Sequence, residues 1–229
     1  LPPITGVERY MANVGETQNK GFEVTLNGRI IDNLNGFSWD VGLNLYHNKN
    51  TLVALASGQD EDRANAWFVG YPINSIFDYK YLGLWGDDEP EQLSALEAVG
   101  VPGMIRVEYT GEYDEDGIPV RRLGPDDRMP QSTDPRFQGG FNTRLAYRDF
   151  DFSVIGAFRS GGVLISTLHG SSGYLNLHSG RRNNVQIDYW TPENTDARYP
   201  VPSGPILSDN PKYGSTLAYF DGSYLKIRS

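Results

Sequence analysis

The stretch "GFNTRLAYRDFDFSVIGAF", residues 140–158, decides the fold class, because apolar side chains recur in it at every second position. Polar side chains fill most of the positions between them. The apolar set is Phe141, Leu145 and Tyr147 before the Arg148–Asp149 break, then Phe150, Phe152, Val154 and Phe158 after it. A period of two residues is that of a β-strand. The stretch therefore predicts a β-hairpin with one apolar face and a two-residue turn at Arg148–Asp149.

A second pair of segments repeats this pattern. Residues 21–30, "GFEVTLNGRI", and residues 37–46, "FSWDVGLNLY", both alternate apolar and polar side chains. The six residues between them, "IDNLNG", contain Asp, Asn and Gly, which favour tight reversals. Aromatic residues gather at the turn ends of both hairpins: Phe37, Trp39, Tyr147 and Phe150. In a membrane barrel they would form an interfacial girdle, whereas in any other sheet they would be ordinary cross-strand pairs.

The connections between the hairpins are long. They run from His47 to Arg136 and from Arg159 to Leu217, and loops of such length are uncommon in compact soluble domains. Short reversals that alternate with very long ones are typical of outer-membrane β-barrels. Within the first connection, residues 77–85, "FDYKYLGLW", alternate like a strand, and residues 89–100, "EPEQLSALEAVG", predict a short helix closed by Gly100.

Composition excludes several classes of protein. The net charge is −9 and the Lys and Arg residues are scattered, which argues against nucleic acid as a partner. The mean hydropathy is −0.47, and no apolar run reaches the roughly 18 residues of a transmembrane helix, although strands of a barrel stay compatible with this value. The chain has no Cys, which excludes disulfides and thiolate metal sites. No leader precedes "LPPITGVERY" and the final residues stop within an alternating run, so we expect a piece of a longer protein.

No catalytic motif is present, and we expect no enzyme. The three His residues form no close-spaced ligand pair, and no nucleophile elbow or nucleotide-binding glycine motif occurs. Residues 112–128, "EYDEDGIPVRRLGPDDR", begin like a calcium-binding loop, with candidate ligands Asp114, Asp116 and Asp126. Leu123 occupies the place of the closing bidentate Glu, so a solvated acidic loop is the favoured interpretation.

Several segments resemble one family. The segment "NVGETQNKGFEVTLNG" resembles the Asn-x-Gly and Asn-Lys-Gly-x-Glu strand of SusC/RagA-type TonB-linked outer-membrane proteins, which are nutrient importers of the Bacteroidota. Four further blocks resemble the C-terminal part of that family's barrel and follow in the same order: "GYPINSIFDYKYLGLWGDDE", residues 101–162, "DYWTPENTDARYP" and "DGSYLKIRS". The acidic stretch departs from the family's Asp-x-Asn-x-Asp-Gly pattern, because Glu112 and Asp114 replace its first two members.

The resemblance implies an all-β transmembrane barrel of roughly 22 antiparallel strands with a plugged lumen. Residues 1–229 would form part of this single barrel domain, while the plug, the TonB box and the final strands would lie outside them. It also implies a location in the outer membrane, import of oligosaccharides or peptides, a SusD-like surface lipoprotein and TonB as partners, and contact with membrane lipid. Apart from the candidate calcium ion, we expect no cofactor.

Two alternatives remain open. In the barrel, the apolar parity of both hairpins faces lipid and the polar parity faces the lumen. A soluble β-sandwich carbohydrate-binding module would instead bury the apolar face in a core, and a porin would lack coupling to TonB. In either the importer or the module, loop aromatic residues are candidate ligand contacts: Trp67, Tyr174 and Trp190. Each of these rings could instead simply pack its own loop.

Overall fold

The computed structural model describes residues 13–172, 188–202 and 211–229, and the chain divides into two compact units. Unit 1 comprises residues 1–75, 136–159 and 225–229, and unit 2 comprises residues 76–135 and 160–224. The strands that lie mainly in unit 1 are β1 Gly15–Leu34, β2 Phe37–Leu55, β3 Glu61–Asp62, β4 Trp67–Phe68, β9 Phe137–Tyr147, β10 Phe150–Ser160 and β13 Tyr224–Ile227. The elements of unit 2 are β5 Ile76–Asp78, β6 Tyr81–Leu84, α1 Pro90–Leu96, β7 Ile105–Val107, a 3₁₀ helix at Pro125–Asp127, β8 Met129–Gln131, β11 Val163–Ile165, α2 Thr167–Ser172, a 3₁₀ helix at Gly214–Ala218 and β12 Tyr219–Asp221.

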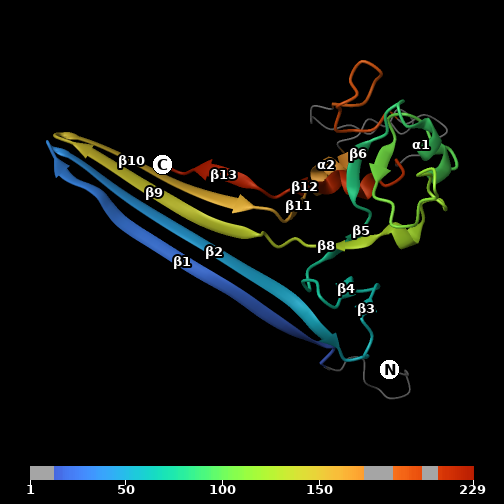
Figure 1. The fold of residues 1–229 in the computed structure, drawn as a ribbon, viewed down its shortest axis with the longest axis horizontal. Coiled ribbons are helices and arrows are strands. Elements are labelled where there is room, and N and C mark those ends of the chain that lie inside the picture. The colour runs from blue at the N-terminus through green and yellow to red at the C-terminus, as the bar shows by residue number, and fades with distance from the viewer. Residues whose placement is uncertain (1–12, 173–187, 203–210) are drawn as a thin grey trace. The chain divides into compact units, whose positions relative to one another are not determined.

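Unit 1 is built on a five-stranded sheet in the order β1-β2-β9-β10-β13. Figure 1 shows β1, β2, β9 and β10 as a row of long neighbouring strands. The β1–β2 turn contains Asn35 (φ 52°) and Gly36 (φ 83°), and two consecutive positive φ angles are those of a hairpin turn that follows the twist of its strands. Both predicted hairpins are therefore present.

The β1–β2 ribbon is longer than the sequence predicts. Its pairing extends from Leu34↔Phe37 at the turn to Gly15↔Leu55, whereas β2 pairs with β9 only from Phe37↔Tyr147 to Tyr46↔Gln138. The expected strand ends near residues 21 and 46 were wrong because alternation of apolar and polar residues fades there. Backbone pairing nevertheless continues, with an added bond from Asn50 Nδ2 to Asn19 Oδ1 (3.0 Å).

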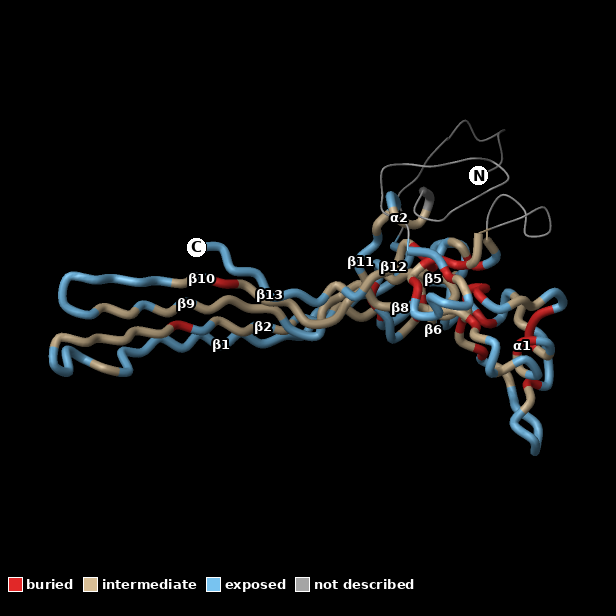
Figure 2. The backbone as a smooth tube through the Cα atoms, turned by 90° about the horizontal axis from the view of Figure 1, so that it is seen from above, coloured by how far each residue is buried: buried red, intermediate tan, exposed pale blue. Residues whose placement is uncertain are grey.

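Unit 2 consists of short two-stranded sheets, β5–β8, β6–β7 and β11–β12, with helices beside them. Residues 77–85 do not form the single strand expected from their alternation. They divide between β5 and β6, which pair with different partners, and a register irregularity lies between Tyr81 and Gly83. Buried residues are concentrated in this unit, as the red stretches around β6 and α1 in Figure 2 show. Two clusters form its core: Ile105, Val107, Tyr199, Tyr213 and Leu217, then Trp85, Leu93, Leu96, Met104 and Tyr109.

The helices of the described residues are short. α1 confirms the predicted helix, but it ends at Leu96, and the backbone N–H of the next residue, Glu97, bonds to Leu93 O. The described helices all lack the length and apolarity that crossing a membrane requires. The chain is therefore mostly strands and irregular connections, in agreement with the predicted all-β class.

Candidate functional site

One face of the unit 1 sheet is apolar across four strands. In register, Leu26 faces Leu43 on β2, and Leu43 in turn faces Phe141 on β9. Strand β10 shares this face, because a Cβ at Gly156 would lie 2.3 Å from the ring of Phe141. The apolar face comprises Phe22, Val24, Leu26, Phe37, Trp39, Val41, Leu43, Leu45, Phe141, Leu145, Tyr147, Phe150, Phe152, Val154 and Phe158.

Many of these large side chains are exposed. Phe150 is 80% exposed, and Leu26 and Phe152 are each 60% exposed. A soluble protein normally buries such a surface, since contiguous apolar patches beyond a few hundred Å² mark contact sites for proteins, ligands or membranes. Near the turns, Trp39 Nε1 donates to Thr143 Oγ1 (2.9 Å), so its polar atom is satisfied within the sheet. The face thus presents hydrocarbon outward with few unsatisfied polar groups.

The opposite face of the same strands is polar and internally bonded. Asn44 Nδ2 donates to Glu23 Oε1 (2.9 Å) and to Thr25 Oγ1 (3.0 Å). Closer to the turns, ion pairs link neighbouring strands: Arg29 with Asp40 (2.9 Å) and Arg144 with Asp151 (2.5 Å). We refer to this surface as the polar face.

A hollow of about 510 Å³ lies on the polar face. Its lining includes the amides of Asn27 and Asn142 and the hydroxyl of Ser153, together with apolar residues such as Ile155. Gly42 lies between the two asparagines in register, and a Cβ there would come within 2.7 Å of Asn27 Oδ1 and 2.3 Å of Asn142 Nδ2. The glycine therefore lets both amides approach over the strand, which leaves groups that can both donate and accept hydrogen bonds facing the hollow.

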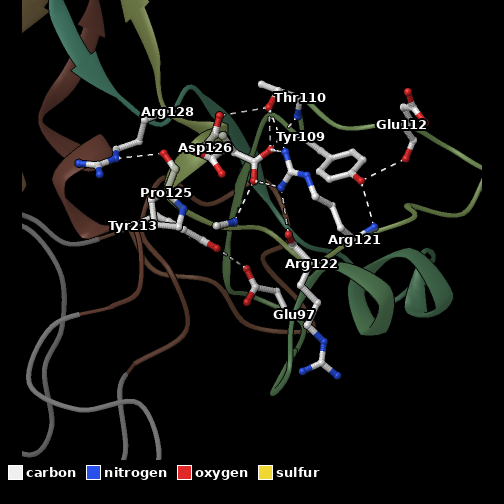
Figure 3. Close-up of polar contacts among 12 residues, drawn as sticks. Glu97, Tyr109, Thr110, Glu112, Arg121, Arg122, Pro125, Asp126, Arg128 and Tyr213 are labelled. Atoms are coloured by element: carbon white, nitrogen blue, oxygen red, sulfur yellow. Dashed lines mark hydrogen bonds and ion pairs between the residues drawn. The ribbon is translucent and has the colours of Figure 1, made fainter. Parts of the chain in front are cut away.

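In unit 2 a buried carboxylate joins Thr110 to the stretch from Arg121 to Asp127. Figure 3 shows the side chains of Thr110 and Arg121 at this site. Asp127 is fully buried and accepts two bonds from Arg121, at 2.7 and 2.8 Å. It also accepts bonds from the backbone N–H of Thr110 (2.9 Å) and of Gly124 (2.8 Å). Burial raises the pKa of Asp127, but the bonds from Arg121, Thr110 and Gly124 outweigh it and bring the pKa from 3.8 to about 2.

A second buried carboxylate ties helix α1 to the C-terminal loops. Glu97 is 3% exposed, accepts a hydrogen bond from Tyr213 Oη (2.7 Å) and pairs with Lys212. Burial and the bond to Glu97 both raise the pKa of Tyr213. The phenol therefore stays protonated at neutral pH and donates its hydrogen bond to Glu97.

An arginine stacked between two rings completes the packing of unit 2. The guanidinium of Arg198 lies 4.6 Å from the ring centres of both Tyr81 and Phe220. Its Nη2 donates to the carbonyls of Leu217 (3.2 Å) and Tyr219 (2.9 Å). Through these contacts the long connections of unit 2 pack against one another. Their outward-facing side chains are therefore carried by a rigid scaffold.

Comparison with known proteins agrees with this geometry. No family model matches the chain. TonB-dependent receptor P3 of Formosa agariphila is 30% identical over 244 residues, which cover 100% of this chain and 23% of that protein. TonB-dependent receptor P26 of the same organism is 26% identical over 239 residues, again covering 100% of the chain and 23% of the relative.

Solved structures show the same fold. The structure of the RagAB peptide transporter superposes with a TM-score of 0.65 at 19% identity, over 100% of this chain and 23% of that one. The RagAB peptide importer in the closed-closed state gives 0.64 at 21% identity, over 100% and 24%. The chain resembles part of a SusC/RagA-type TonB-linked outer-membrane protein. The resemblance expected from the sequence is thereby confirmed, and the chain spans about a quarter of the length of the relatives it matches.

The aromatic residues predicted to contact cargo in such a receptor are placed differently from one another. Trp67 lies in β4 and is half-buried. Trp190 is only 8% exposed, its ring lies against Gly103, and its backbone N–H bonds to Tyr199 O (2.9 Å), so it packs its own loop. Tyr174 lies outside the described residues. A role of the three in binding stays a prediction.

The structure does not assemble a calcium site from Asp114, Asp116 and Asp126. Across the described ranges, no group of three His, Asp or Glu side chains is placed to hold a metal ion. Asp114 Oδ1 instead accepts bonds from the backbone N–H of Asp116 (3.1 Å) and Ile118 (2.7 Å), which shapes an exposed turn. A metal-binding role of the three carboxylates stays a prediction.

Sequence reasoning missed the groups that organise unit 2. Glu97 carries no motif spacing, because its partners Lys212 and Tyr213 lie 115 and 116 residues away. Arg121 and Asp127 are only six residues apart, but they match no motif used in the sequence analysis. The hollow above Gly42 was equally hidden, although its neighbours Asn27 and Asn142 have the parity of the polar face. A glycine on the polar parity of a strand, flanked in register by Asn, is the pattern that would have indicated it.

Proposed function

We propose that residues 1–229 form part of the wall and the extracellular loops of a closed outer-membrane barrel in a TonB-dependent nutrient importer. The observation that carries this proposal is the exposed apolar face of a sheet whose other face is polar and hydrogen-bonded. Lipid-facing and lumen-facing side chains alternate along the strands of such barrels. The apolar face would meet lipid and the polar face the lumen.

Strand length and turn placement support the same interpretation. β9 and β10 are each 11 residues long, close to the 9–11 residues of a tilted membrane-crossing strand. The backbone N–H of Arg148 donates to Gly36 O (3.0 Å), so both short turns lie at one end of the sheet. Short turns of outer-membrane barrels face the periplasm. The long connections, and with them unit 2, would then be extracellular.

The rival interpretations make different demands. A β-sandwich module requires the apolar face to be covered, and the exposure of Phe150 and Phe152 argues against such a cover. A porin would share the wall but import cargo without TonB. Uptake that persists when TonB is deleted would favour the porin, while uptake that is abolished would favour the importer.

Cargo and partners belong to the proposal. The structural neighbours are named as peptide transporters, so peptides are the first cargo to test and oligosaccharides the second. The amides of Asn27 and Asn142 suit either class, since peptides and sugars both offer donors and acceptors. A SusD-like surface lipoprotein and TonB are the proposed partners. Trp67, Tyr174 and Trp190 are the proposed loop contacts.

The test uses the full-length protein in its native outer membrane. Trp67→Ala, Tyr174→Ala and Trp190→Ala are compared with Asp149→Ala in a short turn, with cargo binding, uptake and surface abundance measured for each. We expect Trp67→Ala to lower uptake at normal abundance, since a half-exposed ring can stack on cargo at small entropic cost. Normal uptake by all three variants would move recognition to the lumen wall, the plug or the lipoprotein.

A further inference from the structure

Two lysines of the β1–β2 ribbon stand directly opposite each other. Lys20 pairs in register with Lys49, and Phe22↔His47 is the neighbouring pair on the same face. On the polar side, the bond from Asn50 Nδ2 to Asn19 Oδ1 fixes this register. Directly opposed residues of a β-ladder have Cβ atoms roughly 5 Å apart, and like charges at that distance repel. Because the register of the sheet places Lys20 and Lys49 opposite each other, a negatively charged group between them would relieve this repulsion.

Neither lysine is paired with a carboxylate in the part of the chain that the structure describes. Both are exposed. Lys80 and Lys212, in contrast, are paired with Glu108 and Glu97. This is notable in a chain with 29 acidic and 20 basic residues, where carboxylates are plentiful.

The backbone of a further basic residue, Arg136, lies at the same end of the ribbon. His47 Nδ1 shares a hydrogen bond with the backbone carbonyl of Arg136, which brings Arg136 to the same end of the ribbon. The Arg136 side chain is exposed and likewise has no ion pair among the described residues. Arg136 has the parity of Gln138 on the polar face, so Lys20 and Lys49 are the two cations of the apolar parity where the ribbon leaves the rest of the sheet.

The lysine pair lies just beyond the end of the apolar face, at the level expected for lipid headgroups. Lys20 and Lys49 have the parity of the apolar face, and they lie two residues beyond Phe22, where the apolar band ends. Two strand residues span roughly 7 Å, about the distance from the edge of the hydrocarbon to the headgroup level. Lysine stems can also lie along apolar surface while the ammonium group reaches polar surroundings.

We infer that Lys20 and Lys49 bind the phosphate groups of anionic lipid at the outer rim of the barrel. A phosphate placed between the two ammonium groups would turn their repulsion into two charge-assisted contacts. The inference rests on the proposed function, because it needs the apolar face to be in a bilayer and the long connections to be extracellular. It assigns to β1 and β2 a lipid site that holds the barrel at a fixed depth.

The test is native mass spectrometry of the full-length protein in detergent micelles, with diphosphorylated lipid A and zwitterionic phosphatidylcholine as separate probes. The variant Lys20→Gln/Lys49→Gln is compared with Lys80→Gln/Arg122→Gln, which removes the same charge from exposed positions of unit 2. We expect the wild type and the control to retain lipid A in preference to phosphatidylcholine. The double variant should bind lipid A at least about tenfold more weakly, since each basic residue near an anionic surface contributes several-fold in affinity.

The outcomes separate this inference from the proposed function. Millimolar inorganic phosphate should not displace lipid A, because acyl chains along the apolar face add to the affinity; displacement would make the site an ordinary anion site and overturn the inference. Equal lipid A binding by wild type and double variant would overturn it as well, provided that both resist unfolding in sodium dodecyl sulfate without heating. Failure of the wild type itself to enter bilayers would overturn the proposed function.

Discussion

The parity of the unit 1 strands predicts opposite effects for arginine at two neighbouring positions. Val154 and Ser153 follow each other in β10, the first on the apolar face and the second on the polar face beside the hollow. Val154 is four residues from the turn end of the strand, which is roughly 14 Å along the strand and roughly 10 Å in depth after tilt. It would therefore lie near the middle of the bilayer.

Val154→Arg should destabilise the inserted barrel by about 2 to 4 kcal/mol, the cost of arginine on the lipid face at mid-depth. The ratio of folded to unfolded protein should fall roughly 30- to 700-fold. Ser153→Arg should change stability by about 0.5 kcal/mol or less, because a lumen position stays hydrated. Ser153 also has no hydrogen bond in the described structure that the substitution would break.

The assay is urea unfolding of the full-length protein in lipid vesicles, followed by heat-modifiability on gels and by tryptophan fluorescence. On β2, Val41→Arg and Asn44→Arg form a second pair with the same expected order. Their difference should be smaller, since Asn44→Arg also loses the bonds to Glu23 and Thr25. Equal loss of folding by Val154→Arg and Ser153→Arg would refute the assignment of the two faces.

Two further predictions concern the turns and loops. Because the pKa of Asp127 is about 2 in the folded protein against 3.8 unperturbed, its ionised form stabilises the loops above about pH 4, and this stabilisation of about 2 kcal/mol is lost as the pH falls through 2. The assay is pepsin cleavage between Tyr109 and Asp127 in the full-length protein, with the rate divided by that at a cleavage site elsewhere in the chain. This relative rate should increase from pH 4 to pH 2 in the wild type, whereas the Asp127→Asn variant should be cleaved rapidly at every pH. A relative rate that stays constant with pH in the wild type would contradict the prediction. Gly36→Val should slow refolding into vesicles and lower the free energy of unfolding by about 1 kcal/mol or more, because Gly36 has a φ of 83°. The control variant Asp149→Ala, in the other short turn, should refold like the wild type. Equal refolding rates of the two variants would show that the conformation of the turn does not limit refolding.

How far the sequence predicted the fold depended on where each contact lies along the chain. The β9–β10 hairpin and its turn followed from local alternation, and α1 followed from its own residues. β1 and β2 extended beyond prediction because residues 17–20 and 48–51 are polar on both faces, so periodicity gave no evidence there. The divided strands β5 and β6 were missed because their partners, β8 and β7, lie far along the sequence.

For the candidate sites, too, features that are local in the sequence were predicted, and contacts between distant residues were not. The two faces of the sheet were predicted from parity, and register confirms which residues share a face. The bonds of Glu97 join residues 115 and 116 positions apart, and no spacing rule encodes such pairs. Trp190 looked like an available loop aromatic, but its burial depends on Gly103, a neighbour that only the folded loop supplies.

The measurement that tests the account most directly is depth-resolved quenching along β10. Single cysteines carrying a fluorophore are placed at positions 150–158 of a full-length protein otherwise free of cysteine, and quenching by spin-labelled lipid is compared with quenching by aqueous iodide. We expect lipid quenching at Phe150, Phe152 and Val154, and iodide quenching at the positions between them. Ile155 is decisive, because it is apolar and 47% exposed yet has the parity of the polar face. Iodide access at Ile155 would support the barrel wall, while lipid quenching there, or no alternation along the strand, would contradict it.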